Sequence, residues 1–208
     1  MILTTSEIHK KLFPTFLWQA NNQNIYLTFD DGPHPFTTLK VLEALNKYSI
    51  KATFFLIGKN IINQPLIVKN IIAEGHSIAN HSYNHKRSSS FSYSELKSEI
   101  LLTDQLLNQI SSNSLKYFRP PFGFFTWNTK KVASTLNYKV CMWSLLSGDF
   151  YGWNKNKIIN NVKTNIKNGS IIVFHDNHKT KDTIYESLVE LIPQLLDIGY
   201  KFSNLANV

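Results

Sequence analysis

The chain has 208 residues, of which 43% are hydrophobic and 17% charged, with a formal net charge of +8 at pH 7. This composition excludes a disordered or collagen-like chain. The length suits one domain, expected over residues 1–208, with a core large enough to be stable without disulfides or a structural metal ion. The positive charge is scattered over Lys-rich and Asn-rich segments, so we expect a solvated surface and no nucleic-acid partner, with an anionic glycan or phospholipid-linked sugar left open.

The N-terminal segment lacks the features of a signal peptide. Residues 1–20 contain two lysines, and polar residues and Pro14 interrupt every apolar run. No apolar run in the chain approaches the ~20 residues that span a bilayer. Cys141 is the single cysteine, so an intramolecular disulfide is excluded and we expect a small core residue. The default expectation is a soluble, cytoplasmic protein, unless it is exported by another route.

Strand-like and helix-like segments alternate along the chain. Apolar runs predict strands at 24–29, 50–57, 76–80, 116–118, 138–145, 169–174 and 199–203. Longer amphipathic segments predict helices at 36–48, 65–74, 93–111, 126–136, 155–167 and 182–197. Ser92-Tyr93-Ser94-Glu95 resembles a capping box at the start of the third. Strands separated by helices imply mostly parallel pairing, which predicts an α/β protein with either a barrel or an open sheet.

Five short motifs follow these strand-like runs. Because side chains at the carboxyl ends of parallel strands converge on one face, we expect the motifs to share a pocket. In Thr28-Phe29-Asp30-Asp31-Gly32-Pro33, the Gly-Pro pair ends the strand. Asp30 and Asp31 can therefore both address that pocket, one as a base and one as a ligand. The alternative is a turn whose Asp side chains bond local amides.

His81 and His85 are four residues apart. On a helical turn this spacing puts both imidazoles on one face, at a separation that a divalent ion can bridge, although such pairs are commonly plain surface or core histidines. Adding Asp31 gives two histidines and one carboxylate, which leaves a position for water as catalytic zinc requires. A non-haem iron oxygenase uses the same ligand types, but that chemistry would not explain the remaining motifs.

The third motif is Arg119-Pro120-Pro121-Phe122-Gly123. Neither proline has an amide hydrogen, so the first backbone donor after Arg119 belongs to Phe122, which makes this N–H a candidate oxyanion donor. Arg119 can pair with Asp30 and keep it ionised as a base. The alternative is a rigid turn with an exposed arginine.

His175 closes the apolar run 171–174. Imidazole titrates near neutral pH, so His175 is a candidate general acid that can protonate a departing amine. Asp149 can orient this ring and stabilise its charged form. The alternative is a buried, hydrogen-bonded His175 with Asp176 as a helix cap.

Other histidines and tryptophans receive weaker expectations. We assign no catalytic role to His9, His34, His76 and His178. His34 fits the rim of the site or a surface turn equally well, and His76 is expected to satisfy a backbone group. Sugar-stacking faces could come from Trp18, Trp127 and Trp153, although packing is the commoner fate of tryptophan.

With these motifs in order, the chain resembles the polysaccharide deacetylases of the NodB-homology group, carbohydrate esterase family four. The resemblance spans residues 28–176 and rests on Thr-Phe-Asp-Asp-Gly-Pro, His81-Ser82-x-x-His85 and Arg119-x-Pro121-x-Gly123. It implies a distorted (β/α) barrel of about seven strands. It also implies a divalent metal ion, most often Zn²⁺ with Co²⁺, Ni²⁺ or Mn²⁺ as alternatives, held by Asp31, His81 and His85.

The resemblance also assigns roles to individual residues. It makes Asp30 the base, Arg119 its partner, His175 the acid and Asp149 the residue that tunes His175, with the Phe122 N–H as oxyanion donor. The chain departs from the family at four positions, which bear on substrate fit more than on chemistry. These are Phe122 for a frequent tyrosine, Leu146 for a frequent aspartate, Phe150 for the usual tryptophan and Val173 for the usual leucine, the last two being walls of the acetyl pocket.

The expected activity is hydrolysis of N-acetyl groups on an amino sugar in a glycan, by a metal-activated water with an Asp base and a His acid. The expected substrate is peptidoglycan, a chitin-like oligosaccharide or a related envelope polysaccharide. Three alternatives remain: a deacylase of a lipid-linked amino sugar, a hydrolase of a small cyclic amide, and a glycan-binding relative without turnover. The sequence predicts no oligomeric state.

Overall fold

The computed structural model describes residues 7–112 and 114–208, in which strands and helices alternate. The strands are β1 (Asn24–Asp30), β2 (Thr53–Leu56), β3 (Ser77–Asn80), β4 (Tyr117–Phe118), β5 (Lys139–Val140), β6 (Leu145–Leu146), β7 (Ile171–His175) and β8 (Lys201–Phe202). The α-helices are α1 (Glu7–Leu12), α2 (Thr37–Lys47), α3 (Gly58–Asn63), α4 (Pro65–Ala73), α5 (Tyr93–Ile110), α6 (Trp127–Thr135), α7 (Lys155–Asn165) and α8 (Ile184–Asp197). Short 3₁₀ turns lie at η1 (Ser88–Ser90), η2 (Pro121–Gly123), η3 (Asp149–Tyr151) and η4 (Leu205–Asn207).

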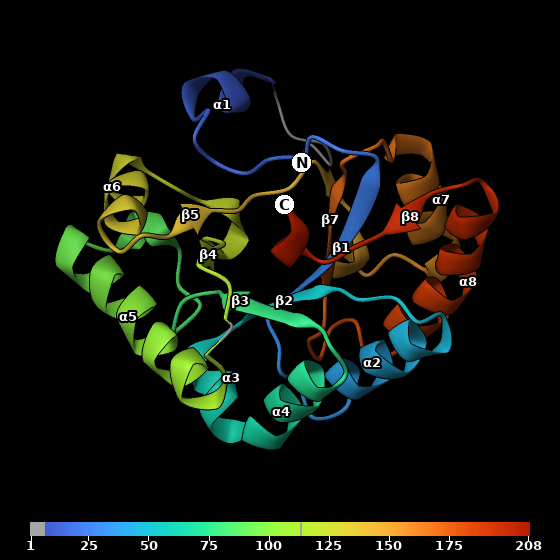
Figure 1. Cartoon of the computed structure of the whole chain (residues 1–208), viewed down its shortest axis with the longest axis horizontal. Coiled ribbons are helices and arrows are strands. Elements are labelled where there is room, and N and C mark those ends of the chain that lie inside the picture. The colour runs from blue at the N-terminus through green and yellow to red at the C-terminus, as the bar shows by residue number, and fades with distance from the viewer. Residues whose placement is uncertain (1–6, 113) are drawn as a thin grey trace.

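The strands form one curled parallel sheet. Its order is β5-β4-β3-β2-β1-β7-β6, and β8 pairs with β1. The helices form an arc outside the strands that runs from α6 through α5, α4 and α2 to α8 and α7 (Figure 1). The seven strands of the main path confirm the predicted distorted barrel and exclude a flat open sheet.

The segment after α1 joins the two sides of the curled sheet. Leu17 pairs in parallel with Cys141, just beyond β5. The Ala20 N–H then donates to the Gly169 carbonyl, just before β7, at 2.9 Å. This segment therefore lies across the opening of the barrel, on the side where Figure 1 shows α1.

Side chains alternate along the central strands between two buried layers. In β1, Ile25 and Phe29 belong to the cluster that packs under the helices, and the Phe29 ring stacks on Phe54 of β2 at 5.1 Å. Tyr26 points into the barrel interior, where it belongs to a separate cluster with Cys141. Burial raises the pKa of Cys141 to about 11, which keeps it a neutral core thiol, as expected. Both faces of β1 are thus dry, as parallel strands between helices require.

The structure differs from the sequence prediction in three places. The predicted strand at 138–145 is split into β5 and β6. The chain leaves β4 after Cys141, and the Ser144 N–H then donates to the carbonyl of Ile171, the first residue of β7. Helices α1 and α3 were not predicted, since each has six residues and is too short for an amphipathic period.

The predicted capping box of α5 is present, with Ser92 and Glu95 bonding each other's backbone N–H.

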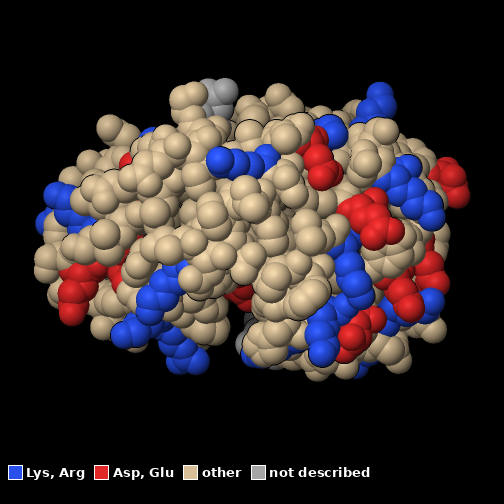
Figure 2. Space-filling view, turned by 90° about the horizontal axis from the view of Figure 1, so that it is seen from below, with Lys and Arg blue, Asp and Glu red and all other residues tan. Residues whose placement is uncertain are grey.

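Surface charge is dispersed. Figure 2 shows Lys and Arg side chains at several separate places on one face, with acidic side chains among them. Within the described residues, no helix combines the length and the apolar character needed to span a bilayer.

Candidate active site

The sheet register brings four polar residues to one end of the barrel. Asp30 is the last residue of β1 and pairs with His175, the last residue of β7. The last residues of β3 and β4 are paired in the same way, so the residues that follow them, His81 and Arg119, leave the sheet side by side. Parallel strands that end together therefore gather side chains from distant parts of the sequence.

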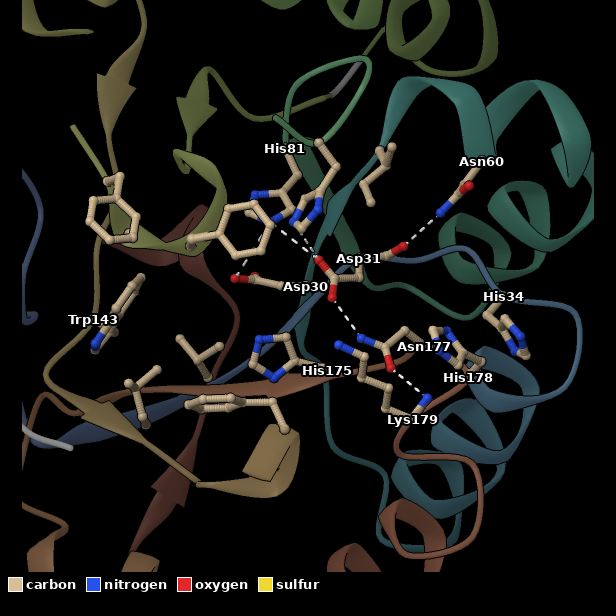
Figure 3. Close-up of a pocket in the computed structure, with 18 of the residues that line it drawn as sticks. Asp30, Asp31, His34, Asn60, His81, Trp143, His175, Asn177, His178 and Lys179 are labelled. Atoms are coloured by element: carbon tan, nitrogen blue, oxygen red, sulfur yellow. Dashed lines mark hydrogen bonds and ion pairs between the residues drawn. The ribbon is translucent and has the colours of Figure 1, made fainter. Parts of the chain in front are cut away.

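A pocket of about 680 Å³ opens at this end (Figure 3). Its polar lining includes the predicted residues Asp30, Asp31, His81, His85 and His175. Its apolar lining includes Phe122, Trp143, Leu146, Phe150 and Val173. The chain thus provides polar groups beside an apolar wall, which is the usual character of a small-molecule site.

Asp31, His81 and His85 form a candidate metal site. Their ligand atoms all lie within 4.8 Å of one another. The Nε2 atoms of His85 and His81 lie 2.9 and 3.5 Å from the same Asp31 oxygen, Oδ1. Two imidazoles and one carboxylate are a donor set that suits zinc and leaves a coordination position free. The imidazoles converge through a loop in which His85 has a φ of 55°, not on the helical turn that their spacing suggested.

Neighbouring groups orient His81 and keep Asp31 ionised. His81 Nδ1 lies 2.8 Å from the Arg119 carbonyl oxygen, which directs Nε2 toward Asp31. Burial alone would raise the pKa of Asp31, but hydrogen bonds from His81 and His85 outweigh it and hold that pKa well below its ordinary value. Asp31 is therefore an anion, as a metal ligand must be.

Two asparagines that the sequence analysis missed hold Asp31. The Asn177 side-chain amide donates to Asp31 Oδ2 at 2.6 Å, and the Asn60 side-chain amide donates to the Asp31 carbonyl at 2.8 Å (Figure 3). The Asn177 Oδ1 accepts the Lys179 N–H at 2.8 Å, so the NH₂ group must face Asp31. A signal for Asn177 existed in its place two residues after His175, whereas Asn60 lies in the unpredicted helix α3.

Asp30 pairs with a fully buried arginine. Arg119 Nη1 donates to Asp30 Oδ1 at 2.7 Å and to Thr28 Oγ1 at 2.8 Å, while Nη2 donates to the Met142 carbonyl at 2.9 Å. The guanidinium also lies 3.9 Å above the Phe55 ring. A buried charge needs this completeness of pairing to be tolerated. The other Asp30 oxygen, Oδ2, lies 4.0 Å from His81 Nε2 and so faces the candidate metal site.

His175 is held by a buried carboxylate. Asp149 Oδ1 lies 2.8 Å from His175 Nδ1, and Asp149 Oδ2 accepts the His175 backbone N–H at 2.6 Å. Burial opposes a charge on this ring, but the Asp149 carboxylate, helped by Asp31 and Asp30, outweighs it and raises the pKa of His175 to about 9. The ring therefore carries a proton at neutral pH.

Phe122 lies at the edge of the site in a left-handed conformation, with a φ of 59°. Its ring packs 4.6 Å from the His85 ring. Within the described part of the chain, its backbone N–H donates to no protein acceptor. An N–H that bonds no protein acceptor is available to a bound group, as an oxyanion donor must be.

The weaker sequence expectations have mixed outcomes. None of Trp18, Trp127 and Trp153 lines the pocket, and the tryptophan that does is Trp143. His34 and His178 line the pocket at the side away from Trp143 (Figure 3). His76 accepts the Ala52 N–H, as expected.

Asp176 does not act as the helix cap considered from the sequence. Its carboxylate is buried and accepts the Thr38 hydroxyl at 2.5 Å. Burial raises the pKa of Asp176 well above its ordinary value, with the charge of Asp31 adding to the effect.

Comparisons with known proteins agree with this geometry. Residues 19–141 match the model of the polysaccharide deacetylase family. The chain belongs to this family. It is 36% identical over 191 residues to a peptidoglycan-N-acetylglucosamine deacetylase of Bacillus cereus, covering 90% of this chain and 69% of that protein. A second protein of that name and species is 33% identical over 207 residues, covering 97% of each chain.

A solved structure is also very similar to this member of the deacetylase family. It is a peptidoglycan N-acetylglucosamine deacetylase in complex with 4-naphthalen-1-yl-N-oxidanyl-benzamide. The TM-score is 0.91 at 32% identity, over 98% of this chain and 96% of that one. Four apolar residues that the sequence analysis expected to bear on substrate fit line the pocket, namely Phe122, Leu146, Phe150 and Val173.

Proposed function

We propose that this chain is a metal-dependent N-deacetylase that removes N-acetyl groups from an amino sugar in a glycan of the peptidoglycan or chitin type. The observation that carries the proposal is that Asp31, His81 and His85 line one pocket together with Asp30 and His175. Asp30 pairs with the buried Arg119, and His175 pairs with the buried Asp149. The relatives, named as deacetylases of N-acetylated glycans, support the same substrate class.

Asp31, His81 and His85 would hold the divalent ion, with Zn²⁺ the best match to two imidazoles and one carboxylate, and Co²⁺, Ni²⁺ or Mn²⁺ as alternatives. When bound, such an ion polarises the amide carbonyl and lowers the pKa of water. The fit rests on the orientation of His81 by the Arg119 carbonyl and on the ionised state of Asp31.

Asp30 acts as the general base in this proposal. Its Oδ1 is occupied by Arg119, which leaves Oδ2 to accept a proton from the attacking water. Arg119 fixes the direction of the Asp30 carboxylate through this hydrogen bond. As the carbonyl carbon becomes tetrahedral, negative charge develops on its oxygen, and in this proposal the Phe122 N–H donates to that oxygen.

His175 acts as the general acid. Its Nδ1 is held by Asp149, so Nε2 carries the proton that passes to the sugar nitrogen as the C–N bond breaks. Because the pKa of His175 is raised, the proton is present throughout the neutral range. The products are acetate and the free amine. Leu146, Phe150 and Val173 supply an apolar wall for the acetyl methyl group.

Asp30→Asn tests the proposal. The variant should still bind Zn²⁺, measured by elemental analysis, but should lose on the order of 10²–10⁴ in the rate of acetate release from chito-oligosaccharides and peptidoglycan fragments. Asp197→Asn makes the same exchange at an exposed position outside the pocket and should leave the rate unchanged. Undiminished turnover by a metal-loaded Asp30→Asn variant would refute the assignment of the base.

The same assay, extended to lipid-linked amino sugars and small cyclic amides, identifies the substrate class. Release of acetate from those compounds alone would replace the glycan with one of the alternatives. A chain that binds N-acetylated glycans but carries no stoichiometric ion and releases no acetate would be a binding protein and not an enzyme.

A further inference from the structure

Arg87 lies at the rim of the catalytic pocket, in the loop between β3 and α5. The Lys and Arg side chains that line the pocket are those of Arg87 and Lys179. The Arg87 guanidinium carbon lies 4.5 Å from the centre of the Phe124 ring and 5.8 Å from the centre of the Phe122 ring. Two aromatic faces therefore hold the position of this charge.

The guanidinium has no acidic partner. Among residues 7–112 and 114–208, no carboxylate lies within ion-pair distance of Arg87, and its side chain donates no hydrogen bond. Contacts with ring faces leave the N–H groups at the edge of the guanidinium free. A planar cation that is fixed in place with free donors suits a planar anion such as a carboxylate, which it can bind through two parallel hydrogen bonds.

The position of Arg87 also indicates that it takes no part in the hydrolytic step itself. Ring contacts run from Arg87 to Phe122 and from Phe122 to the ligand His85, so Arg87 lies beyond the metal ligands as seen from the reacting centre. The two carboxylates that line the pocket do not compensate its charge, because Asp30 pairs with Arg119 and Asp31 contacts His81 and His85. A group bound at Arg87 would therefore belong to a part of the substrate adjacent to the acetamide.

We propose that Arg87 binds a carboxylate carried by a substituent of the glycan, which makes the substrate an acidic N-acetylated glycan in preference to a neutral chitin-like chain. This inference rests on the proposed deacetylase function. A lactyl ether on the sugar and an attached peptide both provide such a carboxylate in peptidoglycan. A neutral oligosaccharide offers hydroxyl and acetamide groups, which make weaker hydrogen bonds to a guanidinium.

The test compares two forms of one tetrasaccharide of alternating N-acetylglucosamine and N-acetylmuramic acid, one with free lactyl carboxylates and one with lactyl methylamides. The wild-type chain should show a kcat/KM about fivefold higher for the carboxylate form at low salt, and the ratio should shrink as salt is added. Arg87→Gln should bring the ratio to about one. Lys86→Gln removes the same charge from the neighbouring exposed residue, which does not line the pocket, and should keep the wild-type ratio.

Binding of both forms is also measured by titration calorimetry in the Asp30→Asn background, so that the inference is tested even if no acetate is released. There, about fivefold tighter binding of the carboxylate form should disappear on Arg87→Gln. An Arg87→Gln variant that keeps the wild-type ratio, or a ratio that falls on Lys179→Gln and not on Arg87→Gln, would overturn the inference. A wild-type ratio of one, both for the lactyl pair and for stem peptides with free or amidated carboxyl groups, would overturn it as well. Turnover of neither form with intact discrimination in binding would instead refute the deacetylase function and retain the carboxylate site. Stem peptides with free or amidated carboxyl groups, attached to the same tetrasaccharide, then distinguish the lactyl source from the peptide source.

Discussion

The variant Asp149→Asn tests whether Asp149 acts by raising the pKa of His175 or only by positioning its ring. In the wild-type chain the pKa of His175 is raised from 6.5 to about 9, which corresponds to about 3 kcal/mol in favour of the charged ring. Burial of the ring opposes this charge, so loss of the Asp149 carboxylate should bring the pKa of His175 back to about 6.5 or lower. At pH 8 the protonated fraction should then fall from about 90% to about 3%, a loss of about 30-fold, whereas at pH 6 it should change less than twofold.

The assay is the pH dependence of kcat/KM for acetate release, with wild type and variant loaded with the same ion. The alkaline limb of the profile should move toward lower pH by about 2.5 units or more, and nitrogen chemical shifts of the imidazole should report the same change directly. Asp197→Asn should leave the profile in place. An equal loss at every pH would mean that Asp149 only positions the ring, and it would refute the argument from acidity.

The same ionisation also predicts how stability depends on pH. The folded-state pKa of His175 is above its unfolded value, so its contribution to the free energy of unfolding is complete below about pH 6.5 and is lost as the pH rises through 9. Denaturant unfolding of the metal-free protein should therefore show up to about 3 kcal/mol lost over this range in the wild type and little of that loss in Asp149→Asn.

Two further changes follow from the contacts around the site and the scaffold. Asn177→Ala removes the hydrogen bond to Asp31 Oδ2, so the affinity for Zn²⁺ in a chelator competition should fall about tenfold, and an affinity equal to wild type would show that the amide does not position this ligand. Ser92→Ala removes the cap of α5 and should cost about 1 kcal/mol in denaturant unfolding with no change in kcat/KM, and any loss of activity at equal stability would contradict a purely structural cap.

Much of the fold could be predicted because its main helices show a clear amphipathic period and its central strands are continuous apolar runs. The helix expected at 93–111 is α5, Tyr93–Ile110, and its cap was visible in the sequence. The run 138–145 could not be divided, because an apolar segment that crosses from one part of a sheet to another has the same composition as a continuous strand. Short helices such as α3 carry too few residues to show amphipathicity.

The candidate site also contains residues that could be predicted from the sequence and residues that could not. Asp31 and His81 could be predicted as site residues because each stands in a short motif directly after a predicted strand. Parallel strands that end together bring such residues to one pocket. Asn177, Arg87 and Trp143 were not singled out, because ordinary surface and core positions carry the same residue types. Their place at the pocket depends on how loops fold back over the sheet, which no local pattern encodes.

The buried guanidinium of Arg119 has a consequence for how this molecule becomes active. It follows β4, yet it touches Asp30 at the end of β1 and the carbonyl of Met142 beyond β5, whose own N–H donates to Leu17 in the segment across the barrel opening. In a partly folded chain the Arg119 guanidinium would lack its hydrogen-bond acceptors, and the Asp30 carboxylate would not be held in its orientation. The Asp30–Arg119 pair therefore depends on the assembled sheet, and cleavage of the chain between α1 and β1 would reach this pair through the contact of Leu17 with Met142.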